Sequence, residues 1–76
     1  MHKKDILKEF GRNLKAERNR AGFSQEGLAE KVGLGFGQHI GKIERGETNT
    51  SLTVIAAIMD VLDIDFEKLY DRKKFL

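Results

Sequence analysis

The sequence predicts an all-α fold of five helices. Apolar residues recur at three- and four-residue spacing in successive segments, and glycine or hydroxyl residues stand at the segment boundaries. The chain shows no alternating apolar and polar stretch, no hairpin dipeptide and no internal repeat. This pattern favours helices over strands throughout.

Length and composition predict one small domain over residues 1–76. The chain has 39% apolar residues and no Cys, Pro or Trp. A chain this short buries only about 60% of the surface that its unfolded form exposes, which leaves no room for a second domain. Without cysteine, the core must come from aliphatic packing, as suits a reducing cytoplasm. The longest apolar run, 52–62, is shorter than a membrane span, so we expect no membrane partner.

The charge is unevenly distributed although the net charge is only +2. Residues 2–31 carry eight Lys or Arg against five acids, whereas residues 46–67 carry five acids and no basic residue. Such asymmetry indicates one basic face, which a polyanion-binding protein would have, although solvated helix faces also produce it.

The first helix is expected from about Asp5, its N-cap, to Arg20, with residues 1–4 forming a basic N-terminal arm. Gly22 is the expected C-terminal stop. The apolar residues of this helix follow one another at four-residue steps: Ile6, Phe10 and Leu14.

Two short helices are expected next. One begins after Ser24 and stops at Gly33, and the other runs from about Phe36 to Arg45 and stops at Gly46. The apolar stripe of the second consists of Phe36, Ile40 and Ile43.

The fourth helix should begin near Thr50 or Ser51 and form the centre of the core, because residues 52–62 are apolar almost all round. Its β-branched residues would permit a strand, but its length and its Ser/Thr start favour a helix. Asp63 or a neighbour must make the following turn without glycine. A last short helix, capped by Asp65, then precedes a tail at residues 71–76.

Residues 24–46 have the spacing of a helix-turn-helix, with a short helix, a connection containing Gly and a second helix that ends at Gly. Two blocks carry a closer likeness: Ser-Gln-Glu-x-Leu-Ala at residues 24–29 and Ile-Glu-Arg-Gly at residues 43–46. With them, the chain resembles the lambda-repressor-like family, also called the Cro or XRE type, over about residues 10–70. Its proline-free loop at 47–52 is similar to that of the restriction-modification controllers, a subgroup of this family.

The resemblance implies a compact five-helix domain that binds double-stranded DNA. The second helix would lie across the phosphate backbone while the third enters the major groove. The resemblance also implies a structural ion pair between Arg18 and Glu44, which ties the first helix to the end of the third.

The candidate base readers are the residues off the apolar stripe of the third helix. Gln38 can pair with adenine N6 and N7, and Lys42 can donate to guanine O6 or N7. His39 can reach a base or a phosphate, and Gly37 would let the backbone approach the groove. The alternative is that these residues are only the solvated side of a short helix.

The candidate phosphate ligands begin with Gln25, because free backbone N–H groups and the helix dipole attract a phosphate at the start of a helix. The remaining candidates are Ser24, Arg45, Lys15, Arg12, Thr48, Asn49 and Thr50, with Lys3 and Lys4 in a wider footprint.

The sequence departs from the family in its turn. Seven steps separate Gly33 from Ile40, one more than is usual, and Gly37 and Gly41 stand where relatives commonly carry contacting side chains. Direct readout should therefore be thinner. Close approach of the backbone or DNA shape could supply specificity instead, and the third alternative is that the protein no longer binds DNA strongly.

No enzyme, cofactor or metal site is expected. The run Gly33-x-Gly35-x-Gly37 follows a helix and lacks the Gly-Lys-Ser/Thr ending of a phosphate loop. The two histidines have no partners at metal-ligand spacing, and neither candidate serine has a recognisable base.

The sequence thus predicts a cytoplasmic transcription regulator, a repressor or autoregulator that binds a two-fold, pseudo-palindromic operator as a homodimer. Its half-sites should lie about one helical turn, ~10 bp, apart. The alternative is a protein-interaction module of the same fold, whose partner, such as a toxin, is unknown. The candidate dimer contacts, which could instead close the core, are Phe66, Leu69, Tyr70, Phe75 and Leu76.

Overall fold

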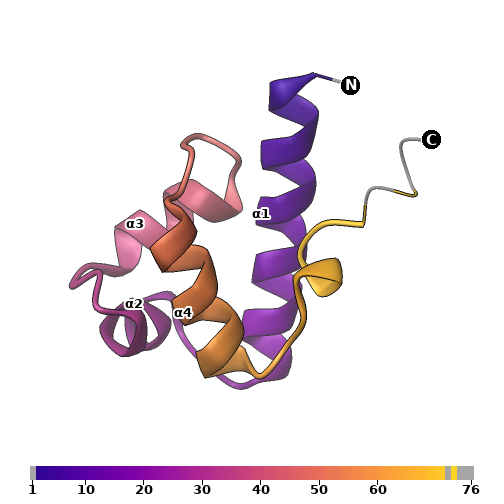
Figure 1. Cartoon of the computed structure of the whole chain (residues 1–76). Helices are drawn as coiled ribbons and strands as arrows, with labels where there is room; N and C mark the ends of the chain where they lie inside the picture. The colour runs from indigo at the N-terminus through magenta and orange to yellow at the C-terminus, as the bar shows by residue number, and fades with distance from the viewer. Residues whose placement is uncertain (1, 72, 74–76) are drawn as a thin grey trace.

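The structure is a computed structural model, and it describes residues 2–71 and 73. This part of the chain forms four α-helices and one 3₁₀ turn and contains no strand. The elements follow in the order α1 (Lys3–Arg20), α2 (Gln25–Val32), α3 (Gly37–Glu44), α4 (Leu52–Leu62) and the 3₁₀ turn (Phe66–Lys68) (Figure 1). The all-α prediction is confirmed, but the expected fifth helix is only this single 3₁₀ turn.

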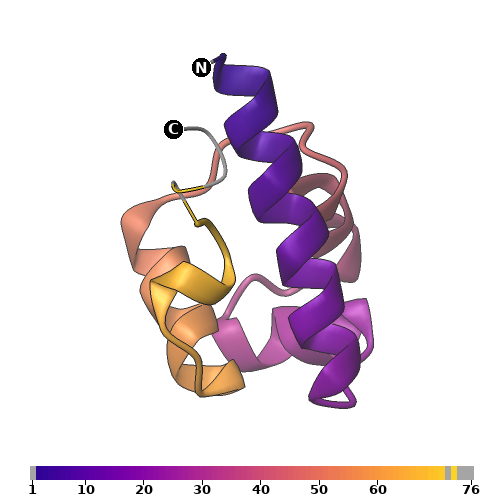
Figure 2. The ribbon, with the colours of Figure 1, turned by 90° about the vertical axis from the view of Figure 1, so that its right-hand side faces the viewer.

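The long helix α1 packs against a group formed by α2, α3 and α4 (Figure 1). The segment after α4 returns along α1, as the turned view in Figure 2 shows. Two contacts fasten it there: Asn13 Nδ2 donates to the Leu69 carbonyl at 2.9 Å, and the rings of Phe10 and Phe66 lie 6.5 Å apart. The 3₁₀ turn therefore closes the core that the fifth helix was expected to close.

Every helix contributes to one apolar core. Because helices of eight residues are marginal alone in water, α2 and α3 depend on this packing. The fully buried large side chains are Leu14, Leu28, Ile40, Ile43, Ile58 and Leu69.

The predicted start of α1 is wrong. The helix begins at Lys3, with His2 as an N-cap that makes no side-chain capping bond, and Asp5 lies in the first turn. Its carboxylate still favours this end, because the helix dipole is positive there. Lys3 and Lys4 are helical, so residues 2–4 do not form an extended arm, and residue 1 lies outside the described residues.

Helix α4 packs on the core, as expected, but it is not buried all round. Only Ile58 and Leu62 are buried, whereas Leu52 is 79% exposed at the first position of the helix. The helix ends as the sequence predicted, because Asp63 adopts the left-handed conformation with φ 54°. A short polar side chain tolerates this conformation better than most. One face of α4 therefore remains available to solvent.

Candidate nucleic-acid interface

The first half of the candidate interface is the start of α2. Ser24 caps this helix, and its hydroxyl accepts from the Gly27 N–H at 2.9 Å. The helix ends at Gly33, which has φ 80°. The cap leaves the hydroxyl proton of Ser24 free to donate, at the positive end of the helix dipole, where an anion is favoured.

The second half is α3, whose first turn packs directly on the first turn of α2. A methyl group added at Gly37 would lie 2.8 Å from the backbone nitrogen of Glu26. Real Cβ atoms do not come this close, so a side chain here would force the helices apart. The glycine at this position thus sets the spacing of the helix-turn-helix.

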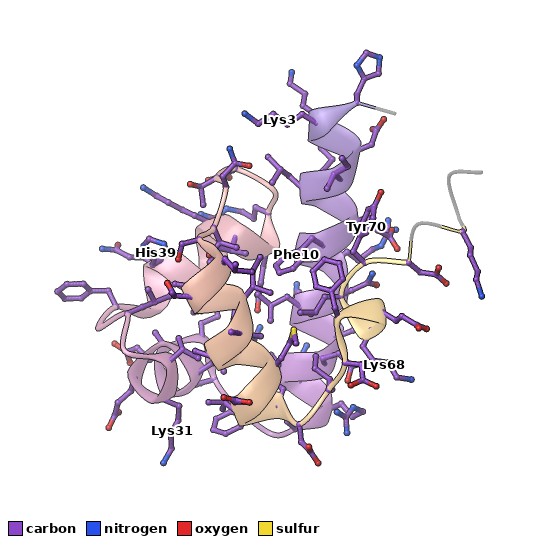
Figure 3. All side chains as sticks on the ribbon, in the orientation of Figure 1. Lys3, Phe10, Lys31, His39, Lys68 and Tyr70 are labelled. Atoms are coloured by element: carbon purple, nitrogen blue, oxygen red, sulfur yellow. The ribbon has the colours of Figure 1, made fainter. Side chains whose placement is uncertain are left out.

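The exposed face of α3 carries the predicted polar side chains. Gln38, His39 and Lys42 are exposed, while Ile40 and Ile43 anchor the opposite face in the core. Figure 3 shows the side chains, with His39 labelled on α3. The structure therefore brings these three candidates together on one solvent-facing surface.

Gly37 is not part of that surface, in contrast to the sequence-based assignment, because it is buried against α2. Gly41 is buried as well. A methyl group there would lie 3.0 Å from Arg45 Nη1 and 3.4 Å from the Gln25 amide. Both glycines make room for neighbours, so neither presents its backbone to a groove.

Arg18 and Glu44 form a buried ion pair across α1 and α3. Arg18 Nε lies 2.6 Å from Glu44 Oε2, and Arg18 Nη2 lies 3.1 Å from Oε1. The third guanidinium nitrogen donates to the Phe23 carbonyl at 2.8 Å. The arginine thus joins the end of α1, the turn before α2 and the end of α3.

Gln25 belongs to the same network. Its Nε2 donates to Glu44 Oε1 at 3.1 Å, and the side chain is half-buried. Sequence reasoning placed Gln25 at a phosphate but did not find this bond, because 19 residues separate the partners. Glu44 therefore holds the amide of Gln25 in a defined position at the start of α2.

Arg45 is paired with Glu47. Its Nε lies 2.7 Å from Glu47 Oε2, and both side chains are exposed. The hydrogen bond between them, with the opposite charge, raises the pKa of Arg45 and lowers the pKa of Glu47. A phosphate that binds Arg45 must compete with this carboxylate.

A line of lysines borders α3 from α1. Lys4, Lys8 and Lys15 share one face of α1 with Gly11, at spacings of four, three and four residues. A methyl group at Gly11 would lie 2.4 Å from the carbonyl oxygens at the end of α3, so this face lies against that helix. Sequence reasoning missed Lys8, although its spacing to the other lysines could have identified it.

Arg12 lies elsewhere. It pairs with Glu9, whose Oε2 accepts from Asn13 Nδ2 at 3.0 Å, and Asn13 in turn binds the Leu69 carbonyl. Arg12 thus belongs to the side of α1 that holds the C-terminal segment, and the structure does not bring it together with the α3 candidates.

The loop before α4 divides its three candidates. Asn49 is exposed, and Thr48 donates its hydroxyl to the Asn49 carbonyl at 3.1 Å. The Thr50 hydroxyl oxygen is buried and has no hydrogen-bond partner within the part of the chain that the structure describes. Thr50 thus cannot reach a phosphate in this conformation, contrary to the sequence-based assignment.

The candidate dimer contacts are also divided. Leu69 is fully buried in the core and cannot contact a partner, which corrects that assignment. Phe66 is 45% exposed, and its ring lies 6.2 Å from that of the half-buried Tyr70. Tyr70 and Phe10, labelled in Figure 3, line one apolar cavity beside α1. Phe75 and Leu76 lie outside the described residues.

Comparison with known proteins identifies the family. The sequence profile of the helix-turn-helix family matches residues 14–69, most of the chain. The chain belongs to the helix-turn-helix family. This family assignment confirms the Cro/XRE-type identification from the blocks at 24–29 and 43–46.

Among curated proteins, this helix-turn-helix chain is 35% identical over 65 residues to the uncharacterized HTH-type transcriptional regulator YazB of Bacillus subtilis, covering 86% of this chain and 93% of YazB. It is 37% identical over 69 residues to the control protein C.SmaI of Serratia marcescens, covering 91% and 81%. These relatives carry the names of regulators and not of enzymes.

Among solved structures, the chain is similar to the restriction-modification controller protein C.AhdI of Aeromonas hydrophila. The two share 39% sequence identity and a TM-score of 0.76, over 87% of this chain and 97% of C.AhdI. With C.SmaI, this similarity supports the controller subgroup, and together the relatives support a DNA-binding transcriptional regulator.

No helix within residues 2–71 is long and apolar enough to cross a membrane. The same residues contain no group of three or more His, Asp or Glu placed to hold a metal ion.

Proposed function

We propose that this helix-turn-helix protein is a sequence-specific repressor or autoregulator that reads base edges in the major groove with α3. The observation that carries the proposal is the orientation of α3. Its apolar residues Ile40 and Ile43 are buried, which turns Gln38, His39 and Lys42 to solvent on one rigid face. These side chains offer the donors and acceptors that distinguish base pairs in the major groove.

The start of α2 supplies the main phosphate contact in this proposal. Ser24 and Gln25 stand at the positive end of the helix, beside α3, and Glu44 holds the Gln25 amide through a 3.1 Å bond. Lys15 on α1, Asn49 in the loop and Arg45 at the end of α3 extend the footprint on both sides. Phosphate contacts of this kind fix the register of the protein on DNA and carry most of the salt dependence.

A homodimer on a two-fold operator completes the proposal. One domain of 76 residues covers too few base pairs to be selective, whereas two domains reading half-sites about 10 bp apart recognise a longer sequence. Phe66, which is 45% exposed and whose ring lies 6.2 Å from that of the half-buried Tyr70, supports a dimer surface at the C-terminal segment. The DNA partner places the protein in the cytoplasm.

The test is fluorescence anisotropy with DNA from upstream of the coding sequence, at two salt concentrations. We expect the double variant Gln38→Ala, Lys42→Ala to lose its preference for this DNA over a scrambled duplex. The matched control is Lys31→Ala, which removes one charge from the last turn of α2. An unchanged preference in the double variant would contradict the assignment of these readers.

A protein-interaction module is the second candidate, favoured by the exposed aromatic ring of Phe66. Salt dependence separates the two functions. Affinity governed by phosphate contacts falls steeply as salt is added, whereas an apolar interface responds little. Sedimentation that shows only monomer at tens of micromolar, with and without DNA, would count against the homodimer.

A further inference from the structure

Phe36 is the most exposed aromatic side chain in the part of the chain that the structure describes. The helical spacing of the sequence assigned it to the apolar stripe of α3 with Ile40 and Ile43; these two are buried, but the assignment of Phe36 is wrong. The structure places Phe36 at the N-cap of α3, with 69% of the residue exposed. A ring of this size is ordinarily buried, since its burial is among the larger favourable contributions to folding.

Glycines stand on both sides of Phe36. Gly35 has φ 80°, a conformation that a larger residue rarely adopts. Gly37 packs on the backbone of Glu26 so closely that it admits no side chain. Phe36 itself is extended, with φ −128° and ψ 130°. The exposed ring thus stands between a glycine in the left-handed conformation and a glycine packed on α2.

The ring stands at the rim of a hollow between the first turns of α2 and α3. Ser24, Gln25 and Gln38 line the same hollow. In the proposed function, the first two contact a phosphate and the third reads a base. The phenyl ring therefore occupies a position between the backbone of the DNA and its base edges, where the first residues of a reading helix meet the groove.

We propose that Phe36 is a specificity-determining residue that packs against the 5-methyl group of a thymine in the major groove. This inference rests on the proposed function. A phenyl ring has no donor or acceptor, so it cannot use the polar code of the base edges. The thymine methyl is the one apolar group that the four bases present in the major groove, and it is the natural partner of an apolar side chain there.

The contact compensates for the small number of polar side chains that α3 offers for base recognition. The glycines at positions 37 and 41 contribute no side chain to the groove, and Phe36 supplies an apolar one. Because the ring is uncharged, its contact releases no counterions and adds nothing to the salt dependence of binding. The contribution of Phe36 is therefore separable from that of the basic side chains.

Replacing thymine by deoxyuridine at single operator positions tests the proposal, because the exchange removes only the methyl group. For the wild type, we expect one symmetry-related pair of thymines at which the exchange weakens binding about four-fold per methyl contact. For Phe36→Ala, the affinity for the unmodified operator should fall, and deoxyuridine at that pair should have no further effect. The salt dependence should not change.

Two controls keep the result interpretable. Phe36→Leu retains an apolar side chain and should retain part of the deoxyuridine effect. Leu52→Ala truncates another exposed apolar residue, 79% exposed at the start of α4, and should leave the effect intact. Melting curves show whether each variant is folded, and we expect no loss of stability for Phe36→Ala because the ring is exposed.

The two possible failures are distinguishable. If the wild type shows no preference for any operator DNA, the proposed function fails and this inference fails with it. If the wild type binds selectively but Phe36→Ala keeps the full deoxyuridine effect, or no thymine shows an effect, the inference about Phe36 alone is overturned.

Discussion

Truncation of Glu44 should destabilise the protein severely. The side chains of Glu44 and Arg18 are 97% and 91% buried, and Arg18 Nε lies 2.6 Å from Glu44 Oε2. The substitution Glu44→Ala therefore leaves the arginine charge unpaired in the interior. Breaking such a pair costs about 3–5 kcal/mol. A domain of 76 residues has a total stability of about 4–11 kcal/mol, so the loss is a large part of the whole.

The expected change in melting temperature follows from this free energy. For a domain of this size, each kcal/mol shifts the melting temperature by about 4–8 °C, so Glu44→Ala should lower it by at least about 12 °C in circular dichroism. The matched control is Glu17→Ala, which removes the carboxylate that lies 2.7 Å from Nε of Arg20, an arginine whose side chain is 59% exposed. Exposed pairs contribute at most about 1 kcal/mol, and the control should melt close to the wild type.

The DNA affinity of Glu44→Ala should change less than its stability. The variant loses the hydrogen bond that positions Gln25. The loss of one such bond should lower the affinity for DNA by up to about ten-fold. Affinity must be measured at a temperature where the variant is folded. A melting temperature within about 3 °C of the wild type, or a drop no larger than that of Glu17→Ala, would refute the reasoning.

Three further variants test the packing of α3 and the pairing of Arg45. Gly37→Ala should destabilise the protein, because its methyl group would lie 2.8 Å from the backbone nitrogen of Glu26. In Gly41→Ala the methyl group meets only the ends of flexible side chains. This variant should be neutral or stabilising by up to about 1 kcal/mol in the same melting assay. A stable Gly37→Ala would contradict the close approach. Glu47→Gln should free Arg45 for a phosphate, raise DNA affinity at low salt and steepen the salt dependence by about one ion. Because the pKa of Glu47 is lowered, its pair with Arg45 is intact at neutral pH and is lost as the pH falls through that lowered pKa. If Glu47→Gln and the wild type bind DNA with equal affinity at pH 7, Glu47 does not compete with a phosphate for Arg45.

The sequence by itself determined the features that depend on neighbours along the chain. Ser24 and Ser51 cap helices, and glycines end α1 and α2, because a cap or a left-handed turn needs a particular residue type at one position. The two motif blocks identified the family because each is a run of neighbouring residues, which the sequence shows directly.

Only the tertiary structure decided the features that depend on residues distant in the chain. Helical spacing assigned Phe36 to the core, but α3 begins one residue later, and Phe36 is an extended N-cap whose ring is exposed. The sequence left Leu69 either at a dimer surface or in the core, and the structure buries it fully, with its carbonyl bound by Asn13 from 56 residues away. Local periodicity records which residues share a helix face, whereas packing against other elements decides whether that face meets the core or the solvent.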